Sequence, residues 1–168
     1  LAGSERQLER HEAADLGAAA EVALAQAGRE AGAAGLRIER VLDPAPVTGD
    51  GALLEQLATN LVDNALRYNH SGGWMHVTTG VVGEEALLRV ANSGAVVPAD
   101  EVKSLFEPFR RLGPDHTASR RGAGLGLSIV RAVATAHGGE VRARAFRDGG
   151  LEVTVLLPVA MPKTGSAR

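Results

Sequence analysis

The chain has 168 residues, 45% of them hydrophobic, and a formal net charge of −2. These values are typical of one globular domain, and the nearly balanced charge argues against a nucleic-acid partner, which would need clustered basic residues. Cysteine is absent, which excludes disulfides and thiolate metal sites. No run of about eighteen apolar residues predicts a membrane helix. Because the lack of cysteine gives no sign of an oxidising compartment, we expect a cytosolic chain. The start at Leu1 without Met indicates a piece of a longer protein, whose remainder could hold a membrane segment.

The start of the chain predicts one helix and one strand. Residues 1–14 are mostly polar and are expected to be the end of a preceding helix or linker. Asp15 is a suitable N-cap for an alanine-rich helix that runs to about Ala34. Residues 36–42 alternate as a half-buried strand does. The Pro-Ala-Pro segment that follows predicts an extended connection.

The stretch from Leu57 to Tyr68 is the most informative part of the chain. It follows Asp50, a second suitable N-cap, and its apolar residues recur every three or four positions on one expected core side: Leu53, Leu54, Leu57, Leu61 and Ala65. Residues four apart also lie above one another, so a polar edge forms from Asn60, Asn64, Arg67 and Tyr68. Asparagine is a mediocre helix former, so two on one edge indicate a site. Local hydrogen bonding is the simpler alternative for a single Asn.

The second half of the chain predicts two hairpins and two helices. Strands are expected at 74–82 and 86–91, and again at 140–146 and 151–157, with glycine-containing turns inside each pair. The remaining expected segments are a loop at 92–98, a short helix at 100–105, an aromatic segment at 106–111, a loop at 112–123, an apolar helix at 124–137 and a frayed tail at 159–168.

This mixture of hairpins and helices predicts the α+β class. We expect a two-layer α/β sandwich, in which a mixed, mostly antiparallel sheet carries about three helices on one face. The domain is expected to span residues 15–158.

A glycine-rich segment precedes the last helix and indicates a phosphate site. It reads Gly-Ala-Gly-Leu-Gly-Leu from Gly122 to Leu127, and a glycine-rich helix start offers free N–H groups and a positive dipole end to an anion. The spacing fits neither the dinucleotide fingerprint nor the P-loop. The alternative is that these glycines only permit close packing.

Arginines flank the same segment. Arg110 and Arg111 precede it, and Arg120 and Arg121 lie in the loop that leads into it. Guanidinium groups make charge-assisted, often bidentate bonds, so this cluster suits a polyphosphate. A merely solvated cluster is the alternative, which we weigh lower because long loops without secondary structure are usually functional.

Three segments, in this order, resemble the ATP-binding catalytic domain of bacterial sensor histidine kinases, in the superfamily of gyrase B, Hsp90 and MutL. The segments are NLVDNALRY from Asn60, FEPFRR from Phe106 and GAGLGLSIV from Gly122. They resemble the asparagine box, the phenylalanine box and the second glycine box of that family. The resemblance implies the Bergerat ATP-binding fold and the cofactors ATP and Mg²⁺.

The resemblance also implies roles for single residues. Asn64 would hold Mg²⁺, Asn60 would support the metal and phosphate site, and Arg67 would approach the phosphates. The adenine would lie against Tyr68, in a pocket that includes Asn92, Gly94 and Val97. The triphosphate cradle would consist of Gly122, Gly124, Leu125, Gly126 and Leu127. Phe106 and Phe109 would anchor a lid, and Arg110 or Arg111 would touch the nucleotide; the implied catalytic residues are Asn60, Arg110 and Arg111.

The chain departs from the family in the first glycine box, usually Asp-x-Gly-x-Gly. Asn92 replaces the Asp that accepts a hydrogen bond from the adenine amino group, and Val96 replaces the second Gly. A neutral amide is a weaker acceptor than a carboxylate, so we expect this chain to bind ATP about tenfold more weakly than a version with Asp would, a difference of ~1.4 kcal/mol.

An amide also offers both a donor and an acceptor, and by rotating it could hydrogen-bond the edge of either adenine or guanine. Relaxed base choice is therefore a hypothesis. Val96 would either narrow the pocket or stiffen its loop.

These observations predict a protein-histidine kinase catalytic domain that donates the γ-phosphoryl of ATP to a histidine on a separate dimerisation domain, which in turn serves a response regulator. We expect a cytoplasmic position in a membrane-anchored sensor, a homodimer only in the full-length protein, and a monomeric piece with little turnover alone. Two alternatives stay open: an anti-sigma-type serine kinase, which usually lacks the FEPFRR segment, and a degenerate scaffolding module, favoured by Asn92 and Val96.

Overall fold

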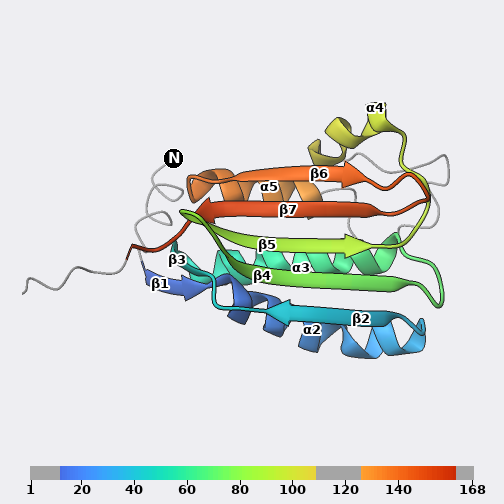
Figure 1. The fold of residues 1–168 in the computed structure, drawn as a ribbon, viewed down its shortest axis with the longest axis horizontal. Helices are drawn as coiled ribbons and strands as arrows, with labels where there is room; N and C mark the ends of the chain where they lie inside the picture. The colour runs from blue at the N-terminus through green and yellow to red at the C-terminus, as the bar shows by residue number, and fades with distance from the viewer. Residues whose placement is uncertain (1–11, 109–125, 162–168) are drawn as a thin grey trace, which may run out of the picture.

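The computed structural model describes residues 12–108 and 126–161. Its centre is a five-stranded sheet (Figure 1). The first two strands in spatial order are parallel and every other neighbouring pair is antiparallel. In spatial order the strands are β2 (Arg37–Leu42), β4 (Trp74–Val82), β5 (Glu85–Asn92), β7 (Leu151–Pro158) and β6 (Glu140–Ala145).

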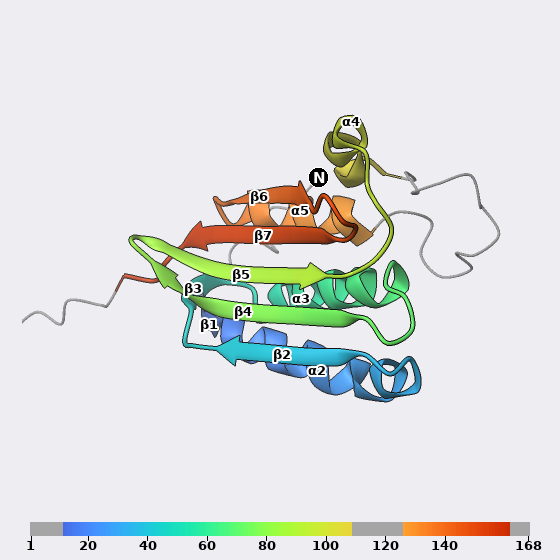
Figure 2. The ribbon, with the colours of Figure 1, turned by 45° about the vertical axis from the view of Figure 1, so that its right-hand side comes forward.

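Helices cover one face of this sheet, as Figure 2 shows. They are α2 (Leu16–Ala33), α3 (Gly51–Arg67) and α5 (Gly126–Ala136). The core lies between the two layers, where Leu57 of α3 and Val77 of β4 are fully buried. A short helix α4 (Ala99–Val102) and a 3₁₀ turn η1 (Lys103–Phe106) follow β5. The predicted class, a two-layer α+β sandwich with a mixed sheet, is confirmed.

Two short strands were not predicted from the sequence. β1 (Glu12–Asp15) pairs antiparallel with β3 (Pro46–Gly49) and forms a separate two-stranded sheet. Each strand has only four residues, which is too short for an alternation pattern to be recognised. Ala14 packs against the core, so the residues just before Asp15 contribute to it. The assignment of residues 1–14 to a preceding segment stays a prediction.

Side-chain caps fix the starts of the first two long helices. Asp15 Oδ1 accepts from Gly17 N at 2.7 Å, and Asp50 Oδ1 accepts from Ala52 N at 3.0 Å, as the sequence predicted. His137, at the end of α5, adds a tertiary cap: its Nε2 accepts from Asp50 N at 3.1 Å, while its Nδ1 donates to Val133 O at 2.7 Å. The end of α5 is thereby tied to the start of α3.

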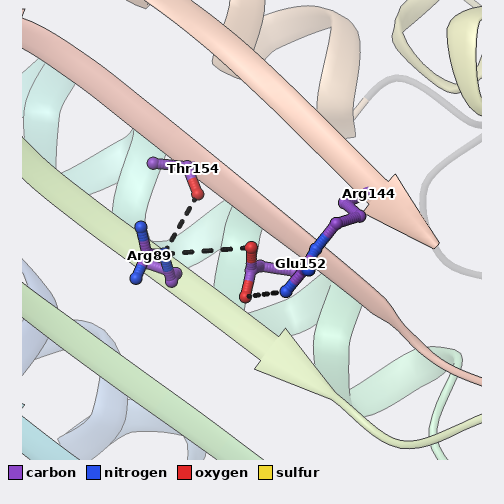
Figure 3. A network of polar contacts seen from close by, with 4 residues as sticks. All are labelled: Arg89, Arg144, Glu152 and Thr154. Carbon is purple, nitrogen blue, oxygen red and sulfur yellow. Dashed lines mark hydrogen bonds and ion pairs between the residues drawn. The ribbon is translucent and has the colours of Figure 1, made fainter. Parts of the chain in front are cut away.

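The opposite face of the sheet carries paired charges, and none of the helices in the described ranges covers it. Figure 3 shows Glu152 between two arginines, with Arg144 Nη2 at 3.3 Å and Arg89 Nε at 4.0 Å. Arg89 Nε also donates to Thr154 Oγ1 at 3.3 Å. Polar side chains thus contact one another on this face, beside the apolar Leu87 and Leu156, while other apolar side chains of the same strands, such as Leu88 and Val155, belong to the core.

The other predicted elements agree with the structure to within about two residues at each end, which is ordinary scatter for element boundaries. The short helix expected at 100–105 is present as α4 and η1. The expected loop at 112–123 lies outside the described residues. Within the described ranges, no helix is long and apolar enough to cross a membrane.

We predict that Asp50→Ala lowers the free energy of unfolding by about 1 kcal/mol, because the substitution leaves the first N–H groups of α3 without a cap. Asp50→Asn should restore most of the loss. Urea denaturation measures the difference, and Glu55→Ala, on the exposed face of the same helix, is the matched control. A loss no larger than that of the control would contradict the assigned cap.

Candidate functional site

A cavity of about 340 Å³ opens where α3 ends, β5 ends and β7 begins. These segments and α4 lie at the right-hand end of Figure 1. Its lining comes from three separate stretches of the chain: Asn64, Tyr68, Asn92, Ala95, Val96, Val97, Pro98, Glu101, Gly150 and Leu151. Four residues predicted from the sequence to hold a nucleotide, Asn64, Tyr68, Asn92 and Val97, are therefore brought together.

A second cavity, of about 440 Å³, lies between the starts of α2 and α3. It is larger, but small or apolar side chains such as Ala14, Ala18 and Leu54 form most of its wall, and no amide or aromatic side chain lines it. Binding sites for small molecules combine an apolar wall with a few convergent polar groups. The first cavity meets this description better, so we take it as the candidate site.

The polar edge of α3 reaches the cavity at its C-terminal half. Asn64 and Tyr68 line the wall, whereas Asn60, one turn earlier, and the exposed Arg67 do not. Asn60 Nδ2 is nevertheless buried without a hydrogen-bond partner among the described residues. A buried donor without a partner is costly, so this amide is available for a group that the described residues do not supply.

Asn92 forms the opposite wall and is almost fully buried, with 4% of its surface exposed. Its Nδ2 donates to Ser93 O at 2.8 Å. Within the described ranges, no hydrogen bond to its Oδ1 is found. The backbone therefore engages one N–H of the amide, which leaves its second N–H and its oxygen for a ligand.

A polar network holds the segment that carries Asn92. Ser93 Oγ donates to Asn69 Oδ1 at 2.7 Å and accepts from Trp74 N at 2.8 Å. Asn69 Nδ2 donates to Trp74 O at 2.9 Å. These bonds connect the end of α3, the start of β4 and the end of β5. The two walls of the cavity are thus fixed relative to each other.

The turn between β6 and β7 closes the base of the cavity. Gly149 and Gly150 have φ values of 107° and 102°, which disfavour side chains. A Cβ on Gly150 would collide with Asn92 O, and one on Gly149 would collide with Gly94 O. Gly150 N also donates to Ala95 O at 3.0 Å. The sequence predicts only a hairpin turn at these glycines, not a part of the site.

The remaining wall comes from the segment between β5 and α4. Val97 is buried, whereas Val96 is 63% exposed at the cavity wall. Glu101 was not predicted as a site residue, because an exposed acid on a short helix carries no sequence signal. Gly94 leaves room for the backbone of the site, since a Cβ there would collide with Tyr68 O.

The described part of the predicted triphosphate cradle is the first turn of α5. Gly126 is the first residue of this helix, and the Leu127 side chain is buried in the core, not in the cavity wall. Phe106 is also buried in the core. The other predicted residues, Phe109, Arg110, Arg111, Gly122, Gly124 and Leu125, lie outside the described residues.

The acids and histidines of the described ranges do not form a metal centre of their own. Among residues 12–108 and 126–161, no three His, Asp or Glu side chains could hold one ion together. Asn64 offers an amide oxygen at the cavity, and Mg²⁺ accepts such oxygen ligands while keeping waters and substrate phosphates. The donor set therefore fits Mg²⁺ only if a phosphate-bearing ligand supplies further oxygens.

The chain is similar to several known proteins. Residues 49–161 match the family described as histidine kinase-, DNA gyrase B-, and HSP90-like ATPase. The chain is 48% identical to the sensor protein CutS of Streptomyces coelicolor over 95% of its own length and 39% of that relative. It is 36% identical to the histidine-protein kinase BaeS of Escherichia coli over 74% of its length and 27% of that relative. The chain thus spans about two-fifths or less of these relatives.

The fold also resembles a solved structure, a mycobacterial sensor histidine kinase, MprB. The TM-score is 0.77 at 28% identity, over 89% of this chain and 97% of that chain.

We predict that Gly150→Ala destabilises the domain by ~3 kcal/mol, combining left-handed backbone strain with displacement of the Asn92 carbonyl. The control is Gly72→Ala, which has a similarly positive φ of 72° but no atom near the added methyl, and should cost ~1 kcal/mol. Thermal and urea unfolding measure both values. Equal losses would show that the close approach to Asn92 is not a constraint.

Proposed function

Because the chain belongs to the histidine kinase-, DNA gyrase B-, and HSP90-like ATPase family, we propose that it binds Mg-ATP and is the phosphoryl-donor half of a sensor histidine kinase. The observation that carries the proposal is the meeting of Asn64, Tyr68 and Asn92 around one cavity. An aromatic ring, an apolar wall and a hydrogen-bonding amide suit a purine base, and a second amide nearby suits its metal-bound phosphates.

The base would lie in the inner part of the cavity. Tyr68 offers a ring face or edge, and the apolar Val97 and Leu151 line the same space. Aromatic and aliphatic side chains of this kind can pack against a flat heterocycle, and few polar groups are then needed to hold it. Asn92 supplies a hydrogen-bonding group to the edge of the base.

The phosphates would extend along α3 toward α5. These two helices pack side by side, and α5 begins at Gly126. A helix N-terminus presents free N–H groups and a positive dipole end to an anion. The unpartnered Nδ2 of Asn60 adds a donor on α3. Asn64 would be the protein ligand of Mg²⁺, which when bound neutralises charge on the phosphates.

The phosphoryl acceptor would lie outside this chain. His137 uses both ring nitrogens within the fold, and His76 pairs with Glu39 on the open face of the sheet. Phosphoryl transfer depends mainly on positioning and electrostatic stabilisation, so a domain can hold the donor while another supplies the nucleophile. We propose that this nucleophile is a histidine of a dimerisation domain, from which the phosphoryl group passes to a response regulator. We also propose that the chain is the cytoplasmic part of a membrane-anchored sensor.

The second candidate is a scaffolding module that has lost nucleotide binding. Asn92 and Val96 favour it, since both depart from the family pattern. The cavity argues against it, because Asn64, Tyr68 and Asn92 still line one space that could hold a nucleotide. A measurement of nucleotide binding distinguishes the two functions.

We predict that Asn64→Ala weakens Mg-ATP binding at least about tenfold, ~1.4 kcal/mol, because the metal loses its protein ligand. Binding of ATP in EDTA should change far less. Isothermal calorimetry measures both constants, and Gln56→Ala, on an exposed part of the same helix, should match wild type. A wild-type domain that binds no nucleotide at millimolar concentration would instead support the scaffolding function.

A second prediction concerns Asn92→Asp, which exchanges an N–H donor for a stronger, charged acceptor. ATP should bind about tenfold more tightly. The nucleotide-free domain should lose about 1 kcal/mol of stability, because a carboxylate cannot donate to Ser93 O. Calorimetry and urea unfolding give the two values. Unchanged affinity together with unchanged stability would contradict the position assigned to this side chain.

A further inference from the structure

Two aromatic rings meet on the open face of the sheet, although the chain has only three Phe, one Trp and one Tyr. The ring centroids of Trp74 and Phe146 lie 5.9 Å apart, and both residues are half-buried. His76 adds a third ring, 4.6 Å from that of Trp74. Because Met75 and Val77 of the same strand belong to the core, the alternate residues Trp74 and His76 face away from the helices.

The backbone of Trp74 is tied to two of the three stretches that line the cavity. Trp74 N donates to Ser93 Oγ at 2.8 Å, and Trp74 O accepts from Ser93 N at 3.1 Å and from Asn69 Nδ2 at 2.9 Å. Ser93 follows Asn92 in the chain, and Asn69 follows Tyr68. Asn92 and Tyr68 both line the cavity, so Trp74 is bonded directly behind both of these walls.

Phe146 belongs to the turn that carries the third stretch. Its N donates to Gly150 O at 3.1 Å, and Gly150 and Leu151 line the cavity. Arg144 Cζ lies 5.3 Å from the centroid of the Phe146 ring, a cation–π arrangement that favours one position of this ring. The contact of Phe146 with Trp74 therefore links the third wall to the other two.

We infer that this aromatic pair, Trp74 and Phe146, positions the walls of the cavity relative to one another from behind, and that both are positioning residues for the nucleotide. β4 and β6 are not neighbours, because β5 and β7 lie between them. The pair thus spans the two strands whose paired ends, Asn92 and Leu151, form part of the wall. Walls that are already held in place lose less conformational freedom when a ligand binds. The inference rests on the proposed function, since it takes the ligand to be a nucleotide.

The test measures Mg-ATP binding by calorimetry, under conditions in which urea denaturation shows each variant to be folded. Trp74→Leu and Phe146→Leu should each weaken binding about fivefold, because either change removes the ring contact. The double variant should lose about fivefold as well, since both changes remove one shared contact. Phe146→Tyr, which keeps a ring, should retain most of the affinity. The control is Arg142→Ala, which removes another side chain of the open face, paired with Glu140, and should match wild type.

Wild-type affinity in both leucine variants would overturn the inference, and so would a double variant whose loss is the product of the single losses. Failure of the wild-type domain to bind nucleotide would overturn the proposed function, and hydrogen–deuterium exchange of the nucleotide-free domain then decides the role of the pair. Exchange at residues 148–151 should be at least about threefold faster in Trp74→Leu and Phe146→Leu than in Arg142→Ala. Equal exchange rates in the three variants would overturn the positioning role.

Discussion

The packing of α3 on the sheet is the constraint on which the site depends. Leu57 and Leu61 are buried against the strands, and this burial fixes the rotation of the helix about its axis. Because Asn64 and Tyr68 share one edge of the helix, fixing the apolar side also fixes where these polar groups lie. The caps at Asp50, from its own carboxylate and from His137, set the start of the helix and hence its position along the sheet.

The elements with long, regular patterns could be predicted from the sequence, and so could the polar edge of α3, because local spacing determines both. The cavity wall could not be predicted in full. Glu101 and Gly150 reach the cavity through the approach of segments far apart in the chain, and no local pattern encodes that approach. β1 and β3 were missed for a similar reason: each is four residues long and is stabilised by its partner.

Asn92 illustrates how the surroundings decide the chemistry of a side chain. As a residue type it offers a donor and an acceptor. In the fold one of its two N–H groups donates to Ser93 O at 2.8 Å, so the backbone sets the orientation of the side chain. The glycine turn at 149–150 belongs to the same arrangement, since it allows β7 to press on the backbone of Asn92.

The central claim is that a nucleotide occupies the cavity between α3, β5 and β7. Backbone hydrogen–deuterium exchange of the domain, with and without Mg-ATP, tests it most directly. The account predicts slower exchange at residues 92–98 and 148–151 when nucleotide is bound, and no change at residues 13–19 and 51–55 around the second cavity. Slower exchange around the second cavity, with residues 92–98 unchanged, would contradict it.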